Sequence, residues 1–134
     1  MIETARRTDP LTRVVALLAS AYRALPQSKL LGTLPDGRTR VEAGHRLAAL
    51  FAVWGQGVEE RALPVAPQWR ELPFNGPFIV GDQIAVTGHD LVAGLRGLRG
   101  LDELVWRADG GRVSAGEVLE LAIREAKWIK EVMW

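Results

Sequence analysis

The chain of 134 residues contains no cysteine. This absence excludes disulfide bonds, thiolate nucleophiles and cysteine-ligated zinc or iron–sulfur clusters. The chain also has no uncharged apolar run of the roughly 20 residues that would span a bilayer, and its first residues lack the apolar core of a signal peptide. We therefore expect a cytoplasmic protein that has no membrane partner.

The chain carries little net charge, +1 at neutral pH, and no basic run of five residues. Nucleic acids and anionic membranes are held by dense positive patches, so we expect no nucleic-acid partner. P-loop, dinucleotide-binding and serine-hydrolase motifs are absent, and we predict no cofactor. With 48% hydrophobic and 25% charged residues, residues 1–134 read as a single globular domain.

The first predicted helix begins at Asp9-Pro10, because an aspartate cap followed by proline suits the first helical turn. It runs to about Leu25, and Pro26 ends it. Its apolar residues recur at spacings of three and four. They are Leu11, Val14, Val15, Leu18, Tyr22 and Leu25.

The same plan returns 73 residues later, where Asp82 begins a second predicted helix. Seven pairs of identical residues are related by this offset: Asp9/Asp82, Leu18/Leu91, Arg23/Arg96, Leu25/Leu98, Leu31/Leu104, Asp36/Asp109 and Gly37/Gly110. From Arg40 onward an offset of 72 gives six more, among them Arg40/Arg112 and Val41/Val113. Ordinary composition would give about four identities over this length. We interpret the pattern as an internal duplication.

The predicted fold is mainly α: a four-helix bundle built from two helix–turn–helix halves. Residues 9–61 form the first half, residues 62–81 a proline-rich connector, and residues 82–133 the second half. Pro35-Asp36-Gly37 and Asp109-Gly110-Gly111 have the residues that tight turns require. Their flanks form either two short β-hairpins or irregular connections.

The second helix of each half carries a capping signal, Thr39 with Glu42 and Ser114 with Glu117. The offset of 72 places Glu42 opposite Ser114, so the two signals do not align. The two helices therefore begin at slightly different points, or one signal is accidental.

The connector contains four prolines, which forbid a long helix. It is nevertheless too apolar for a free linker. We expect it to lie against the bundle and bury Trp69, Phe74, Phe78 and Ile79.

The last predicted helix has an apolar arc that covers about half its circumference, wider than a surface helix needs. Trp128 belongs to this arc, and Glu125 stands near its middle. Glu125 pairs with an arginine such as Arg23 or Arg96, reaches water at a helix end, or acts as an acid, base or ligand contact in a cavity. The arc predicts cover from the connector or from another subunit.

The two histidines offer weak signals. Glu42 and His45 match half of a di-iron motif, but no second copy exists, so we predict no metal. His89 lies away from the apolar stripe of its helix and is expected at a surface or an interface. No catalytic residue is assigned.

Gly88, Gly94 and Gly97 weaken the helix that starts at Asp82. Two interpretations stay open: the glycines allow close packing, or they leave room for a ligand between helices.

We predict a non-catalytic helical interaction domain that forms a homodimer or another homo-oligomer. A small molecule or a protein would bind near the connector and the last helix, because aromatic-rich apolar surface marks interfaces. The alternative is a small enzyme or ligand-binding protein with an inter-helix pocket that uses Glu125 and His45 or His89. The candidate ligand or interface residues are Glu125, Trp128, Trp69, His45 and His89.

Overall fold

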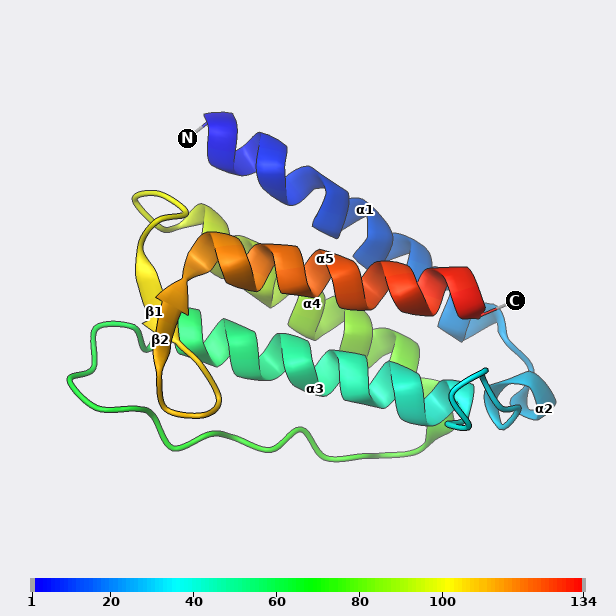
Figure 1. Cartoon of the computed structure of the whole chain (residues 1–134). Helices are drawn as coiled ribbons and strands as arrows, with labels where there is room; N and C mark the ends of the chain where they lie inside the picture. Colours follow the sequence, from blue (N-terminus) through cyan, green and yellow to red (C-terminus); the bar gives the residue numbers. More distant parts are fainter. Residues whose placement is uncertain (1, 134) are drawn as a thin grey trace.

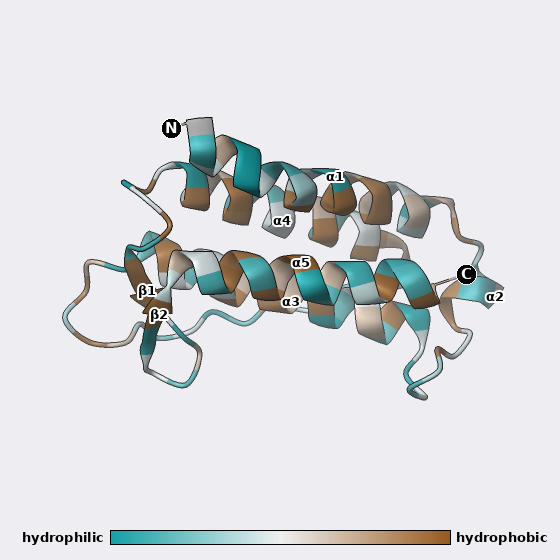
Figure 2. Ribbon diagram, turned by 45° about the horizontal axis from the view of Figure 1, so that its top comes forward, coloured by the Kyte–Doolittle hydropathy of each residue, from teal (hydrophilic) through white to brown (hydrophobic). Residues whose placement is uncertain are grey.

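The computed structural model describes residues 2–133, and within them four long helices pack together, which confirms the mainly α bundle. The helices are α1 (Ile2–Ala24), α3 (Arg40–Glu59), α4 (Val80–Arg96) and α5 (Ala115–Val132). α4 packs against both α1 and α3, and α5 packs against the same two helices (Figures 1 and 2). The apolar faces, brown in Figure 2, are turned toward the space between the helices. They form one core of buried residues.

None of the helices within residues 2–133 is long and apolar enough to cross a membrane. Their apolar residues are instead confined to the faces that meet in the core, as expected for amphipathic helices of a bundle.

The described residues contain one β-hairpin, formed by β1 (Leu104–Trp106) and β2 (Arg112–Ser114). Val105 pairs with Val113 in an antiparallel register. Of the two alternatives, the second half thus has the hairpin. The first half has an isolated bridge between Thr33 and Thr39 and is otherwise an irregular connection.

The two tight turns have the same backbone hydrogen bonds. The Leu34 N–H donates to the Arg38 carbonyl at 2.7 Å, and the Arg107 N–H donates to the Gly111 carbonyl at 2.7 Å. Each turn needs one left-handed residue, which glycine supplies at the lowest cost. These residues are Gly37 (φ 88°) and Gly110 (φ 90°).

Helix α1 begins earlier than the sequence predicts. It starts at Ile2 and continues through Pro10, so the predicted start at Asp9-Pro10 is wrong. Thr4 and Thr8 are buried, and the Thr8 hydroxyl donates to the carbonyls of Thr4 and Ala5. Burial of these two side chains against the bundle offsets part of the cost of the hydrogen bond that the proline removes.

Helices α3 and α5 begin at the predicted caps. Thr39 and Glu42 form a reciprocal capping box, and the Ser114 hydroxyl accepts from the Glu117 N–H at 3.3 Å. Both capping signals are therefore used in the folded chain.

Helix α4 begins at Val80, two residues before the predicted start at Asp82. It follows the short 3-10 helix η1 (Pro77–Ile79).

The predicted register between the second helices is wrong. The offset of 72 matches Arg40 and Val41 of α3 with Arg112 and Val113, which lie in strand β2. The caps Thr39 and Ser114 are 75 residues apart instead. At that offset five of the nine buried residues of α3 match buried residues: Ala43/Val118, Gly44/Leu119, Leu47/Ala122, Phe51/Ala126 and Val58/Met133.

Between α1 and α4 the offset of 73 agrees with the burial pattern. Seven of the eight buried positions of α4 have a buried counterpart in α1: Thr8/Gly81, Leu11/Ile84, Val14/Thr87, Val15/Gly88, Leu18/Leu91, Ala19/Val92 and Tyr22/Leu95. The exception is Val80, which corresponds to the exposed Arg7. The two helices therefore present the same face to the core.

Reciprocal ion pairs join α1 and α4. Arg23 pairs with Asp82 at 2.7 Å, and Arg96 pairs with Asp9 at 3.0 Å. Each pair joins an aspartate of one helix to an arginine of the other, and the offset of 73 converts one pair into the other. Exposed ion pairs contribute only about 0.2–1 kcal/mol, so they orient the helices more than they stabilise them.

Glycine permits two close approaches in the bundle. A Cβ at Gly88 would lie 2.7 Å from a Val15 methyl carbon, so Gly88 allows α1 to lie close against α4. A Cβ at Gly57 would overlap the Trp106 carbonyl oxygen, so Gly57 allows β1 to lie on α3. The buried Trp106 Nε1 has no hydrogen-bond partner within the described residues.

Candidate binding groove

The connector between α3 and α4 runs in an extended form along the bundle. Figure 1 shows this green segment returning beside α3, from the end near the hairpin to the end near α2 (Gln27–Leu30). Side chains of the bundle bind its backbone at three places. Arg112 donates to the carbonyls of Arg61 and Leu63, and Gln83 donates to the carbonyl of Pro73.

The third and central attachment is Gln56 of α3, whose side chain is buried. Its Nε2 donates to the Gln68 carbonyl at 2.8 Å, and its Oε1 accepts from the Arg70 N–H at 2.9 Å. One amide side chain thus satisfies a donor and an acceptor of the connector, as a neighbouring strand would. The same Nε2 donates to Glu60 at 2.7 Å.

A groove of about 710 Å³ lies between α3, α4 and the middle of the connector. Its apolar lining includes Phe51 and Val58 from α3, Ala93 from α4 and Leu72 from the connector. Gly55, Gly94 and Gly97 also line it. A Cβ at Gly94 would lie 3.2 Å from a Val58 methyl carbon, so this glycine also allows α4 to lie close against α3. The volume falls in the range of about 300–1,000 Å³ that is typical of small-molecule sites.

The remaining lining of the groove is polar. Arg70 pairs with Glu59 at 2.9 Å, and both side chains are largely exposed. Arg61 pairs at 2.8 Å with Glu103, which lies outside the groove. The hydrogen bond from Arg61 is the main reason that the pKa of Glu103 lies below its ordinary value. The groove thus combines apolar walls with charged side chains.

The predicted burial of the connector is only partly correct. Trp69 and Ile79 are half-buried, and Leu72 packs against the core. Phe74 and Phe78 are 52% and 65% exposed, so their predicted burial is wrong. The connector is held mainly by hydrogen bonds from Arg112, Gln56 and Gln83, and apolar contacts contribute less than expected.

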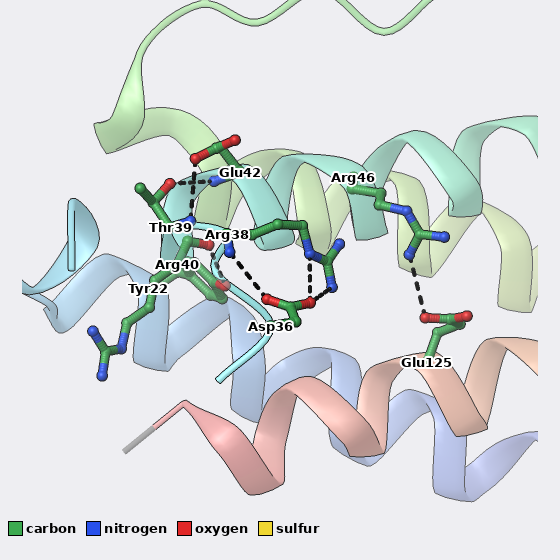
Figure 3. A network of polar contacts seen from close by, with 8 residues as sticks. All are labelled: Tyr22, Asp36, Arg38, Thr39, Arg40, Glu42, Arg46 and Glu125. Carbon is green, nitrogen blue, oxygen red and sulfur yellow. Dashed lines mark hydrogen bonds and ion pairs between the residues drawn. The ribbon is translucent and has the colours of Figure 1, made fainter. Parts of the chain in front are cut away.

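Glu125 pairs with an arginine, but with neither of the two named from the sequence. Its Oε2 lies 3.4 Å from Arg46 Nη1, across the space between α5 and α3 (Figure 3). Arg23 and Arg96 are instead paired with the two aspartates of α1 and α4. The Glu125 side chain is 35% exposed. Solvent and Arg46 therefore offset the cost of placing a carboxylate on the apolar arc.

The other candidate residues are scattered over the bundle. His45 of α3 contacts Gln83 Oε1 at 3.1 Å and lies edge-on to the Phe74 ring at 5.3 Å. His89 is exposed on α4. Trp128 of α5 lies under the Arg38 guanidinium at 5.4 Å, and Trp69 lies in the connector. Among residues 2–133, no hydrogen bond or ion pair joins Glu125 to either histidine.

The described part of the chain contains no group of three or more His, Asp or Glu side chains placed to hold a metal ion. The start of α3 holds a polar network instead (Figure 3). The Tyr22 hydroxyl donates to the Arg40 carbonyl at 2.6 Å, and burial raises the pKa of Tyr22. This network joins α1 to α3 and has a structural role.

Sequence reasoning missed most of the groove. Gln56, Glu71, Leu72, Thr87 and Asp90 were not candidates, and none of them belongs to a motif. The glycines were the available signal. Close packing explains Gly88 and Gly94, where an added Cβ would lie 2.7 Å and 3.2 Å from valine methyl carbons. Gly94 and Gly97 also line the groove, and the interpretation that they leave room for a ligand stays a prediction.

Comparisons with models of protein families, with curated proteins and with solved structures gave no match.

Replacing Gln56 with alanine should release the middle of the connector. The substitution leaves the Gln68 carbonyl and the Arg70 N–H without their partner, so we expect a loss of about 1–3 kcal/mol in the free energy of unfolding. Hydrogen exchange at the Arg70 amide should become faster.

Gln68→Ala is the matched control, because it removes a side chain but keeps the carbonyl that Gln56 binds. Urea titration and amide exchange measure both effects. Equal stability and equal exchange in the two variants would show that Gln56 does not hold the connector.

Proposed function

We propose that the chain is a non-catalytic helical interaction domain that binds a small effector molecule in the groove between α3, α4 and the connector. The observation that carries the proposal is the groove of about 710 Å³ with apolar walls and a charged rim. Pockets of this size and character hold small molecules in other proteins. Because Gln56 and Gln83 fix the connector, the groove is preformed, which lowers the entropic cost of binding.

The last helix has less support as part of this binding site, because α5 contributes no residue to the lining of the groove. α5 contributes instead to a smaller hollow of about 440 Å³, where Val118 and Leu121 lie beside Trp54 and Val113. The enzyme alternative gains no support, since Glu125 pairs with Arg46 while His45 faces Gln83.

We also propose that the two halves arose by internal duplication. Three features support this interpretation: the matching burial of α1 and α4 at an offset of 73, their reciprocal ion pairs, and the equivalent turns. Relatives compared half against half should show the same offset. A different offset in each relative would contradict the duplication.

A homodimer stays a prediction. The arc of α5 that suggested it is largely covered within the chain, since Val118, Leu119, Ala122, Ala126, Ile129 and Met133 are all buried. Light scattering should give a mass of about twice 14.7 kDa. A mass of one chain over about a hundredfold range of concentration would contradict it.

The groove should bind a neutral apolar probe, 2-(naphthalen-2-yl)ethanol. Because the probe would lie against the small residues of the groove, we expect its titration to shift the amide resonances of Gly55, Gly94 and Gly97 most strongly. Ala93→Trp fills the groove from α4 and should weaken binding by about tenfold or more, since the large side chain takes the space of the probe.

Val86→Trp is the control for this experiment, because Val86 is exposed on the same helix and does not line the groove. This variant should bind the probe as the parent chain does. Shifts spread over the whole surface, or equal binding by the two tryptophan variants, would contradict the proposed site.

A further inference from the structure

The charged groups that line the groove are three carboxylates and two guanidinium groups. The carboxylates are Glu59, Glu71 and Asp90, and the guanidinium groups are Arg61 and Arg70. Their arrangement decides which ligand charge the groove favours.

Both guanidinium groups already have carboxylate partners. Arg70 pairs with Glu59 in the groove, and Arg61 pairs with Glu103 outside it. A paired guanidinium offers little to an anionic ligand, because a new anion would have to compete with the carboxylate that it already binds.

Glu71 of the connector and Asp90 of α4 are the two carboxylates that remain. Both are exposed, and neither has an ion pair among residues 2–133. They belong to different walls of the groove, one on the connector and one on the helix. An occupant of the groove would therefore meet an excess of negative charge from both walls.

We infer that the ligand of this groove is an organic cation, an apolar body that carries an ammonium group. This inference rests on the proposed function and names the ligand class for the same site. The apolar body would lie against Ala52, Leu72 and Ala93, which line the groove and are not fully buried, and the ammonium group would lie near Glu71 and Asp90 at the rim. The apolar side chains of the walls would contact the apolar body, and the carboxylates of the rim would attract the positive charge.

Three probes with the same naphthalene body test the inference: 2-(naphthalen-2-yl)ethylammonium, 2-(naphthalen-2-yl)ethanol and naphthalen-2-ylacetate. Their dissociation constants are measured by calorimetry at low salt, where exposed charges are least screened. The ammonium probe should bind more tightly than the alcohol by about twofold to thirtyfold, the range expected for two exposed ion pairs. The acetate should bind most weakly.

The double variant Glu71→Gln with Asp90→Asn should bind the ammonium probe and the alcohol with equal affinity. Because the two probes are compared within the same variant, any effect of the substitutions on the shared naphthalene body cancels from the ratio of their dissociation constants. A control variant, Glu120→Gln with Glu131→Gln, removes the same charge from α5 outside the groove. This control should keep the preference for the ammonium probe.

The outcomes separate the two proposals. If the alcohol binds in the groove and the ammonium probe binds no better, the proposed binding site is supported and the cation inference is overturned. Tightest binding of the acetate would also overturn it. If no probe shifts the groove amides, the proposed function fails together with the inference.

Discussion

The close packing of Val15 against Gly88 is the contact on which the rest of the bundle depends. These residues occupy equivalent positions of α1 and α4, and a side chain at Gly88 would overlap Val15. The reciprocal ion pairs Arg23–Asp82 and Arg96–Asp9 hold the same two helices together. α4 is thereby held against α1, and its other side forms the groove with α3 and the connector.

The sequence predicts what local chemistry decides. The caps Thr39 and Ser114 and the turn glycines Gly37 and Gly110 are confirmed, because hydrogen-bonding side chains and positive φ leave clear signals. The predicted start of α1 was wrong, because the helix continues through Pro10 and the residues before it bury Thr4 and Thr8. Tertiary packing of this kind leaves no local signal.

The predicted alignment of α3 with α5 at an offset of 72 was wrong for a different reason. The identities at an offset of 72 join residues of different secondary structure, since Arg40 and Val41 lie in α3 whereas Arg112 and Val113 lie in β2. A count of identical residues does not locate the start of a helix, whereas the caps Thr39 and Ser114 do. Counting identities therefore misplaced α5. The groove was missed because its residues belong to no sequence motif. They lie together only in the folded chain, where Gln56 holds the connector against α3.

A double-mutant cycle at Val15 and Gly88 tests the central contact most directly. Gly88→Ala should lower the free energy of unfolding by about 1–3 kcal/mol despite its better helix propensity, because the added methyl group overpacks the contact. Val15→Ala removes the obstructing methyl groups, so the double variant should be more stable than additivity predicts by about 1 kcal/mol or more. Additive effects, or an unchanged stability in Gly88→Ala, would contradict the account.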